Sequence, residues 1–328
     1  MNKVLKRGLS VLCSLTIIAI IYWRMDVTRL LPVFRACDPL WMGLSLGMLV
    51  PLILSTAWRL DQLMPGGRRL GFRESNRLVL AASTLNLVLP SKMGDFAKAW
   101  FMKERGHLRA EQAFALVVFE KASDMLSLLL WCAFGLLLYS EKNLLFWVMT
   151  VGVTGGLVVG LLLLGSPTVA GLAFRIGYRL LPGKFRAKLG KLESAWQEMH
   201  QFCWQDKARL WLVAGTSVFI WFLHLLQIWM FTLALRVQVP FLAGLALSPL
   251  AILAGLLPLT FAGVGTRDAA LIFFFRSYLD APTGAALGIL CTLRYVLPAL
   301  SGLPYMTSYL AGLRAARQPE TGAPLKSD

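Results

Sequence analysis

Nine ionisable side chains other than histidine fall inside long apolar segments, and these residues have the types and spacing that could do chemistry. They are Lys92, Asp95, Lys98, Glu120, Lys121, Asp124, Arg267, Asp268 and Arg294. A charge at the centre of an apolar membrane helix costs about 2.5–3.5 kcal/mol, so these groups must pair with one another or face water or a polar ligand. The set holds five cations and four acids. A small surplus of positive charge favours an anionic ligand.

The spacing of three of these residues predicts a charge network on one helix. Glu120 and Asp124 are four residues apart and share a helix face, and Lys121 lies where it can bridge to Asp124. These acids, with Asp95 and Asp268, are expected to position the cations or to carry protons. The alternative for Lys98 and Glu120 is a shallow position, from which the side chain extends to the interface.

Two segments with the same pattern stand 168 residues apart, as measured between Pro90 and Pro258. Each consists of an apolar helix, a Leu-Pro step, a glycine-bearing turn, a basic residue, an aspartate and a second helix. Proline ends the incoming helix, and glycine permits a tight reversal. The predicted turn residues are Pro90, Gly94, Pro258, Gly263 and Gly265.

The second helix of each segment begins with unpaired N–H groups and the positive end of a helix dipole, which together favour an anion such as phosphate. Lys92 and Arg267 stand beside these ends, and Arg294 adds a third cation from the last apolar segment. We therefore predict that Lys92, Arg267 and Arg294 bind an anionic group. Asn86 either joins them or ties helices together. Asp95 and Asp268 have an alternative role as helix caps.

The composition places these segments in a membrane. Of the 328 residues, 57% are hydrophobic and 15% are charged, against about 45–50% and about 25% in soluble domains. A water-soluble single core is therefore excluded. The net charge of +16 could suggest nucleic acid, but the basic residues lie between apolar runs, as in cytoplasmic loops. Membrane lipids, and no nucleic acid, are the expected partners.

About 20 apolar residues are needed to cross about 30 Å of hydrocarbon. Two apolar segments do not fit a single crossing, because Leu78 to Pro90 is too short and Phe241 to Leu279 is long and interrupted. The fold class expected is an all-α polytopic membrane protein with about six full spans. These are Leu9 to Trp23, Leu40 to Trp58, Gln112 to Tyr139, Leu144 to Leu164, Leu210 to Leu235 and Thr283 to Leu310.

The positive-inside rule assigns the two misfit segments. If the first crossed the membrane, the Lys/Arg-rich loop from Ser166 to Arg209 would lie outside. We therefore predict two inverted re-entrant helical hairpins, which enter from opposite faces and meet near the midplane. Both termini are then cytoplasmic. Within the long loop, Lys184 to Phe202 has helical periodicity and predicts a helix on the inner leaflet, as a topological anchor or a recruiter of anionic lipid.

Residues 1–313 are expected to form one transmembrane domain with halves of about 1–140 and 141–313. Residues 314–328 form a disordered cytoplasmic tail. The five cysteines have no CxxC spacing, and the three histidines are far apart in the sequence. No metal site, no cofactor and no catalytic residue are therefore predicted.

The segments from Asn86 to Asp95, from Phe119 to Asp124 and from Leu257 to Asp268 resemble the lysylphosphatidylglycerol synthase transmembrane (flippase-like) family. The resemblance covers about Leu9 to Leu310. It implies a multi-pass protein of the bacterial or archaeal inner membrane that moves a lipid between leaflets. The large soluble transferase domain of the aminoacyl-lipid synthases has no counterpart here, so a stand-alone transporter is expected rather than an enzyme.

The cargo implied is an anionic or aminoacylated lipid of phospholipid, polyprenyl-phosphate or hopanoid type, with its headgroup at the hairpin tips. The alternative is an accessory subunit or enzyme of lipid-linked glycan or glycolipid synthesis. Homo-oligomers or a lipid-synthesis partner enzyme are possible partners under either hypothesis.

Overall fold

The computed structural model describes residues 30–65, 69–88, 94–180, 186–256 and 265–317, and every regular element within these ranges is a helix. The all-α class is therefore confirmed. The helices are α2 (Leu30–Arg35), α3 (Pro39–Gly47), α4 (Leu49–Gln62), α5 (Phe72–Val88), α6 (Asp95–Glu104), α7 (Ala110–Leu138), α8 (Leu144–Gly165), α9 (Pro167–Leu180), α10 (Arg186–Gln205), α11 (Lys207–Ala234), α12 (Phe241–Gly255), α13 (Thr266–Phe274) and α14 (Ala281–Arg317).

Four helical segments in the described ranges are long and apolar enough to cross a membrane, and each coincides with a predicted span. The predicted crossing from Gln112 to Tyr139 is one helix of 29 residues, α7, which carries three of the ionisable side chains. The predicted span from Leu9 to Trp23 lies outside the described residues. The four segments are Pro39–Gln62, Leu144–Gly165, Lys207–Ala234 and Ala281–Tyr309.

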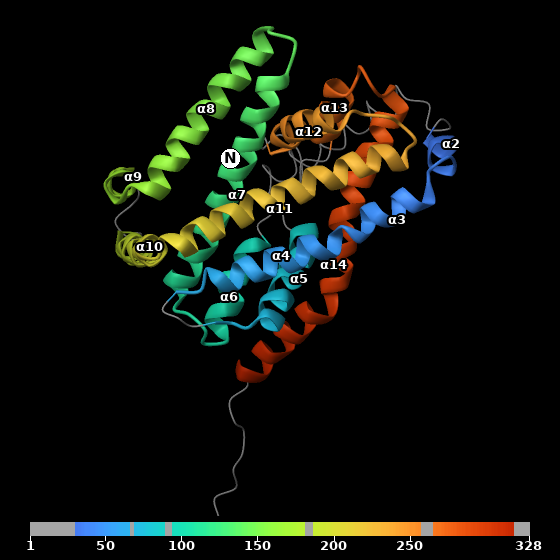
Figure 1. The fold of residues 1–328 in the computed structure, drawn as a ribbon. Coiled ribbons are helices and arrows are strands. Elements are labelled where there is room, and N and C mark those ends of the chain that lie inside the picture. Colours follow the sequence, from blue (N-terminus) through green and yellow to red (C-terminus); the bar gives the residue numbers. More distant parts are fainter. Residues whose placement is uncertain (1–29, 66–68, 89–93, 181–185, 257–264, 318–328) are drawn as a thin grey trace, which may run out of the picture.

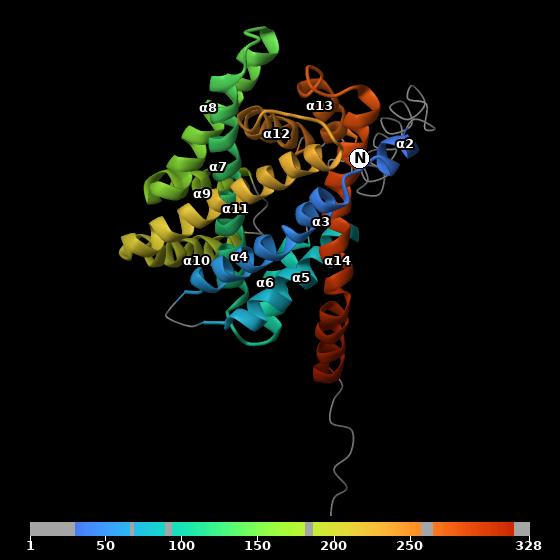
Figure 2. The same ribbon diagram turned by 45° about the vertical axis from the view of Figure 1, so that its right-hand side comes forward.

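Both segments that did not fit a single crossing form pairs of short helices. Helix α5 packs on α6, and α12 packs on α13. Figures 1 and 2 show the α12–α13 pair above α11, whereas the α5–α6 pair lies below α4. The two helix pairs therefore occupy different parts of the molecule. Their entry into a membrane from opposite faces stays a prediction.

One long helix of each half packs on the other half's helix pair. The last helix of the second half, α14, lies along α5, and the last helix of the first half, α7, lies along α12. Two glycines mark these crossings, since a Cβ added to Gly302 would meet the carbonyl oxygen of Leu80, and one added to Gly135 would meet that of Ala246. At each of these two crossings the backbones of the two helices approach closely at a glycine. This similarity is expected of a structural repeat.

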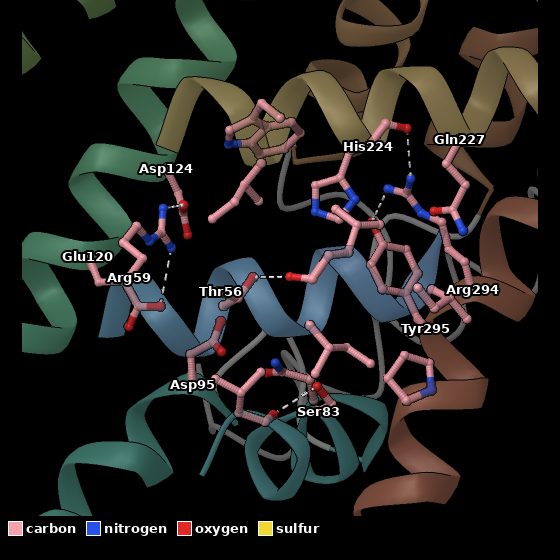
Figure 3. Close-up of a pocket in the computed structure, with 18 of the residues that line it drawn as sticks. Thr56, Arg59, Ser83, Asp95, Glu120, Asp124, His224, Gln227, Arg294 and Tyr295 are labelled. Atoms are coloured by element: carbon pink, nitrogen blue, oxygen red, sulfur yellow. Dashed lines mark hydrogen bonds and ion pairs between the residues drawn. The ribbon is translucent and has the colours of Figure 1, made fainter. Parts of the chain in front are cut away.

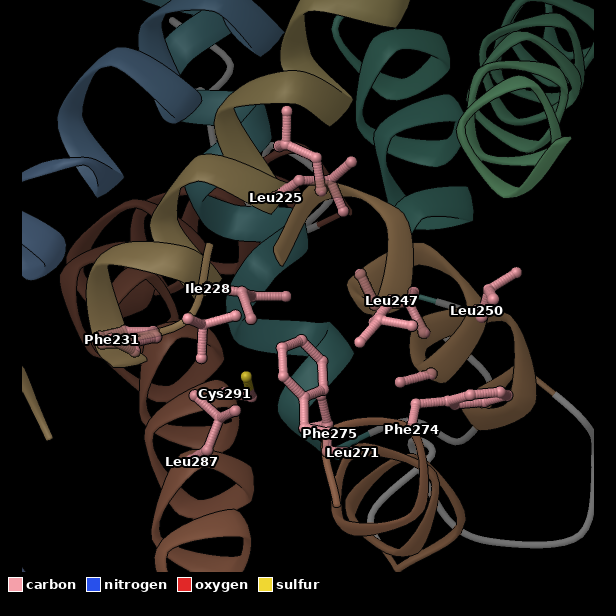
Figure 4. Packing of buried hydrophobic residues seen from close by; sticks show 14 of the residues in the cluster. Leu225, Ile228, Phe231, Leu247, Leu250, Leu271, Phe274, Phe275, Leu287 and Cys291 are labelled. Carbon is pink, nitrogen blue, oxygen red and sulfur yellow. The ribbon is translucent and has the colours of Figure 1, made fainter. Parts of the chain in front are cut away.

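The apolar core around α12 contains residues of both halves, since Leu128, Leu129, Cys132 and Leu136 of α7 belong to it. Side chains from α11, α12, α13 and α14 interdigitate in one cluster (Figure 4). Phe275 and Leu287 are fully buried within it, against Leu250 from α12. This packing fixes the position of α14 relative to α11, and the two helices contribute the polar side chains described below.

The predicted helix from Lys184 to Phe202 is present as α10, but its apolar face is not left free for lipid. Ala195, Met199 and Cys203 are buried in a cluster with residues of α7. At the surface of this contact, Glu198 accepts hydrogen bonds from Arg109 and Gln112. Helix α10 therefore supports α7, the helix that carries Glu120, Lys121 and Asp124.

Candidate functional site

Six charged side chains from three helices form a closed ring in which acids and cations alternate. Arg59 comes from α4, Asp95 and Lys98 from α6, and Glu120, Lys121 and Asp124 from α7. The ion pairs in order around the ring are Arg59–Glu120 (3.3 Å), Glu120–Lys98 (2.6 Å), Lys98–Asp95 (3.8 Å), Asp95–Lys121 (2.9 Å), Lys121–Asp124 (3.0 Å) and Asp124–Arg59.

This charge ring satisfies buried charges that would be costly alone. Each carboxylate contacts two cations and each cation contacts two carboxylates, so the ring has no net charge. Lys98 and Glu120 are almost fully buried. Both side chains therefore lie in the protein interior and do not extend outward, and their mutual ion pair explains why they can lie there.

Arg59 is the member of the ring that the sequence did not indicate. It was placed in a loop because the apolar run of its segment ends at Trp58. In the structure α4 continues to Gln62, and Arg59 is buried and donates to Asp124 and to the Ser217 hydroxyl of α11. The available signal was that apolar residues continue beyond Trp58, at Leu60, Leu63 and Met64.

A cavity of about 300 Å³ lies between α4, α5, α7, α11 and α14. Figure 3 shows residues of the charge ring at one end and Arg294, His224, Gln227 and Tyr295 at the other, with Thr56 between them. All six ring residues line this space. One end of the cavity is therefore neutral because its charges are paired, whereas the other end carries positive charge.

Arg294 provides this positive charge, which no carboxylate balances in the described part of the chain. The residue is 3% exposed. Its guanidinium donates to the His224 carbonyl at 3.3 Å and to the Tyr295 hydroxyl at 2.9 Å, and its Nε–H has no acceptor. A buried guanidinium that contacts only neutral acceptors at a cavity wall is suited to bind an anion.

Two carboxamides with buried oxygens line the same cavity. Asn86 of α5, a predicted binding residue, and Gln227 of α11 each have a side-chain oxygen without a hydrogen-bond donor in the described structure. Gln227 is a second residue that sequence reasoning missed, although a carboxamide inside an apolar span was a visible signal. The structure thus brings Asn86 and Arg294 together and adds Gln227.

Arg267 is held away from the cavity, whose lining does not include it. Its guanidinium donates to Asp268 Oδ1 at 2.6 Å, to the Gly288 carbonyl at 3.1 Å and to the Thr292 hydroxyl at 2.7 Å. Because Thr292 itself lines the cavity, Arg267 reaches it only through this hydroxyl. Through these hydrogen bonds Arg267 links α13 to α14.

The two described turn glycines serve different purposes. Gly265 has φ of 96°, a left-handed conformation that glycine adopts without strain, and its N–H donates to Asp268 Oδ2 at 3.1 Å. This contact fits the capping alternative for Asp268. Gly94 has a helical φ of −59°, so its backbone conformation does not itself require glycine. A Cβ at Gly94 would lie 2.6 Å from the Ala82 carbonyl oxygen, so glycine is needed for close approach to α5.

The remaining predicted site residues fall outside the described part of the chain. They are Pro90 and Lys92 of the first turn, and Pro258 and Gly263 of the second. Among described residues the membrane set still contains five cations and four acids, since Arg59 joins it. Arg294 is the cation left without an acid.

Comparison with known proteins places this arrangement in a family. Residues 9–302 match the lysylphosphatidylglycerol synthase TM region. The chain belongs to this family. It is also similar to the UPF0104 membrane protein MJ1595 of Methanocaldococcus jannaschii, with 24% identity over 323 residues, which cover 92% of this chain and 94% of the relative. Family membership and the four apolar helices identify a multi-pass membrane protein.

The family match extends over both helix pairs and the charge ring. It begins at residue 9, within the predicted first span, and ends at residue 302, in α14. The site therefore lies wholly inside the part of the chain that defines this lysylphosphatidylglycerol synthase TM family, which implies a lipid-related role in the membrane.

Proposed function

We propose that the protein translocates an anionic lipid headgroup between the leaflets of the inner membrane. The observation that carries this proposal is Arg294, a buried cation at the cavity wall whose contacts are all neutral. A phosphate placed against it gains charge-assisted hydrogen bonds and supplies the missing negative charge. The acyl chains stay in the lipid, because a cavity of about 300 Å³ is at the small end of ligand pockets.

The charge ring supports transport rather than chemistry on the lipid. Each ring carboxylate is shared between two cations, so its oxygens are committed to ion pairs. In this proposal the ring fixes α4, α6 and α7 around the headgroup path. Both termini are cytoplasmic, and partners are membrane lipids, with a second copy or a lipid-synthesis enzyme as a further partner.

Leaflet exchange of a fluorescent phospholipid in proteoliposomes tests the proposal. Dithionite bleaches only label that is in the outer leaflet. With the purified protein present, the bleached fraction should therefore exceed the fraction of label that was in the outer leaflet at the start. Arg294→Gln should slow exchange by about 10- to 100-fold, as expected for loss of about 1.5–3 kcal/mol of charge-assisted hydrogen bonding.

Arg276→Gln is the matched control, since Arg276 is an exposed arginine paired with Glu141 at the surface. It should exchange lipid like the wild type. Equal exchange by Arg294→Gln and wild type would contradict the proposal. Conversion of a radiolabelled lipid donor by the purified protein would instead favour the alternative, a role in lipid-linked glycan or glycolipid synthesis.

A further inference from the structure

Helix α9 has an apolar face that the described parts of the chain leave largely uncovered. This apolar stripe consists of Leu172, Ile176 and Leu180, which recur every four residues and are 55%, 49% and 78% exposed. The opposite face of the helix packs on α10, where the Tyr178 hydroxyl donates to Glu193 at 3.0 Å. The apolar stripe is therefore directed away from the protein.

Helix α9 directly follows a candidate membrane span. Helix α8 is long and apolar enough to cross a membrane, and most of its large apolar side chains are exposed. It ends at Gly165, because Pro167 lacks an N–H and disfavours helical backbone at Ser166. Figure 1 views α9 and α10 nearly along their axes, whereas α8 runs across the picture. Helix α9 therefore lies across the end of the span.

A tryptophan marks the level of this end in the membrane. Trp204 of α10 donates from Nε1 to the Leu164 carbonyl in the last turn of α8 at 3.1 Å, and its side chain is 40% exposed. Tryptophan is enriched at the boundary between hydrocarbon and headgroups. The next candidate span, α11, begins directly after α10, at Lys207. The segment of α9 and α10 thus connects two spans at one face of the membrane.

Two exposed arginines border the apolar stripe. Arg175 lies three residues after Leu172, and Arg179 lies three residues after Ile176, so each arginine is a neighbour of a stripe residue on the helix surface. The sequence of α9 contains no acidic residue. Long basic side chains beside an apolar face can lie along hydrocarbon while their charges reach lipid phosphates. The charge of this surface is therefore complementary to an anionic leaflet.

We infer that α9 is an interfacial helix whose apolar stripe inserts into one leaflet and whose Arg175 and Arg179 select anionic phospholipid. This surface is separate from the cavity, and the lipid that it binds belongs to the surrounding bilayer. The positive-inside rule assigns the surface to the inner leaflet. The helix expected there from the sequence, Lys184 to Phe202, has its apolar face on α7 instead.

Fluorescence quenching at the apolar stripe tests this inference. A full-length variant that lacks the native cysteines and carries Ile176→Cys is labelled with a fluorophore and reconstituted into phosphatidylcholine vesicles. Phosphatidylglycerol or phosphatidylcholine, brominated near the headgroup end of the acyl chains, is added at equal mole fraction. We expect the brominated phosphatidylglycerol to associate about fivefold more tightly, as expected for one favourable arginine contact. At Val159→Cys, an exposed site on α8, both lipids should quench equally.

Removal of the two arginines tests which groups select the lipid. In Arg175→Gln/Arg179→Gln the two association constants should lie within about twofold of each other. Arg236→Gln/Arg276→Gln is the control with the same change in net charge, because both of these arginines are exposed and lie outside α9. It should keep the fivefold preference. A preference retained in a folded Arg175→Gln/Arg179→Gln protein would overturn the inference.

Three other results would also overturn the inference. Absence of quenching at Ile176→Cys by both lipids would place α9 away from the bilayer, and equal quenching by both would exclude selection of anionic lipid. Cross-linking of Ile176→Cys between two copies, with the label shielded from lipid, would assign the stripe to a second copy. Arg294→Gln should leave the preference unchanged even where leaflet exchange is lost, which separates this surface from the proposed function.

Discussion

Glu120 is the residue on which the charge ring depends most, because it is fully buried and contacts both Arg59 and Lys98. Glu120→Gln should lower stability by about 3–5 kcal/mol, since it leaves two buried cations with less negative charge between them. Thermal unfolding in detergent, followed by fluorescence, measures the change. Glu141→Gln, at the exposed pair with Arg276, should cost about 0–1 kcal/mol.

A double variant distinguishes loss of charge balance from loss of packing. Removing Lys98 together with Glu120, as Lys98→Met and Glu120→Gln, leaves Arg59, Asp124, Lys121 and Asp95 as a neutral chain of ion pairs. The double variant should be more stable than Glu120→Gln alone. If it is less stable, the ring is not held by charge balance.

At the scale of elements, the contact of α14 with α5 depends on Gly302. Any side chain there meets the Leu80 carbonyl oxygen and the Thr84 hydroxyl, so Gly302→Ala must separate the two backbones. We expect a fall in the unfolding temperature and loss of leaflet exchange. Gly43→Ala is the control, because a Cβ at Gly43 on α3 meets nothing within 4 Å, and its unfolding temperature should not fall.

The contact of α10 with α7 should depend on pH. The Gln112 hydrogen bond, followed by the Arg109 charge and hydrogen bond, lowers the pKa of Glu198 from its ordinary value of 4.5. A lowered folded-state pKa stabilises the protein above the ordinary value, and this stabilisation is lost as the pH falls through the folded-state pKa. The unfolding temperatures of wild type and Glu198→Gln should differ at neutral pH and converge well below pH 4.5. An equal difference at all pH values would contradict this assignment.

At the scale of the whole molecule, we predict that the two helix pairs open toward opposite sides of the membrane, as the positive-inside rule indicates. In a chain without native cysteines, Lys103→Cys in the last turn of α6 and Tyr278→Cys after α13 mark the outer ends of the pairs. An impermeant maleimide applied to intact cells should label Tyr278→Cys only, and permeabilised cells should label both. Labelling of both in intact cells would exclude inverted hairpins.

The sequence by itself determined the all-helical membrane class, four of the spans, the helix at α10 and the pairing of Lys121 with Asp124. These features depend on local apolar length and on helical spacing. The sequence also predicted a surplus of positive charge in the membrane segments, because five cations and four acids fall there. The tertiary structure decided which cation is left without an acid.

Ring partners such as Arg59 and Asp124 are 65 residues apart in the sequence, so their contact depends on how α4 and α7 cross. Likewise, the fold turned Arg267 toward α14 and left Arg294 and Gln227 at the cavity. Spacing along one helix specifies its faces, but it does not specify which face of another helix lies opposite.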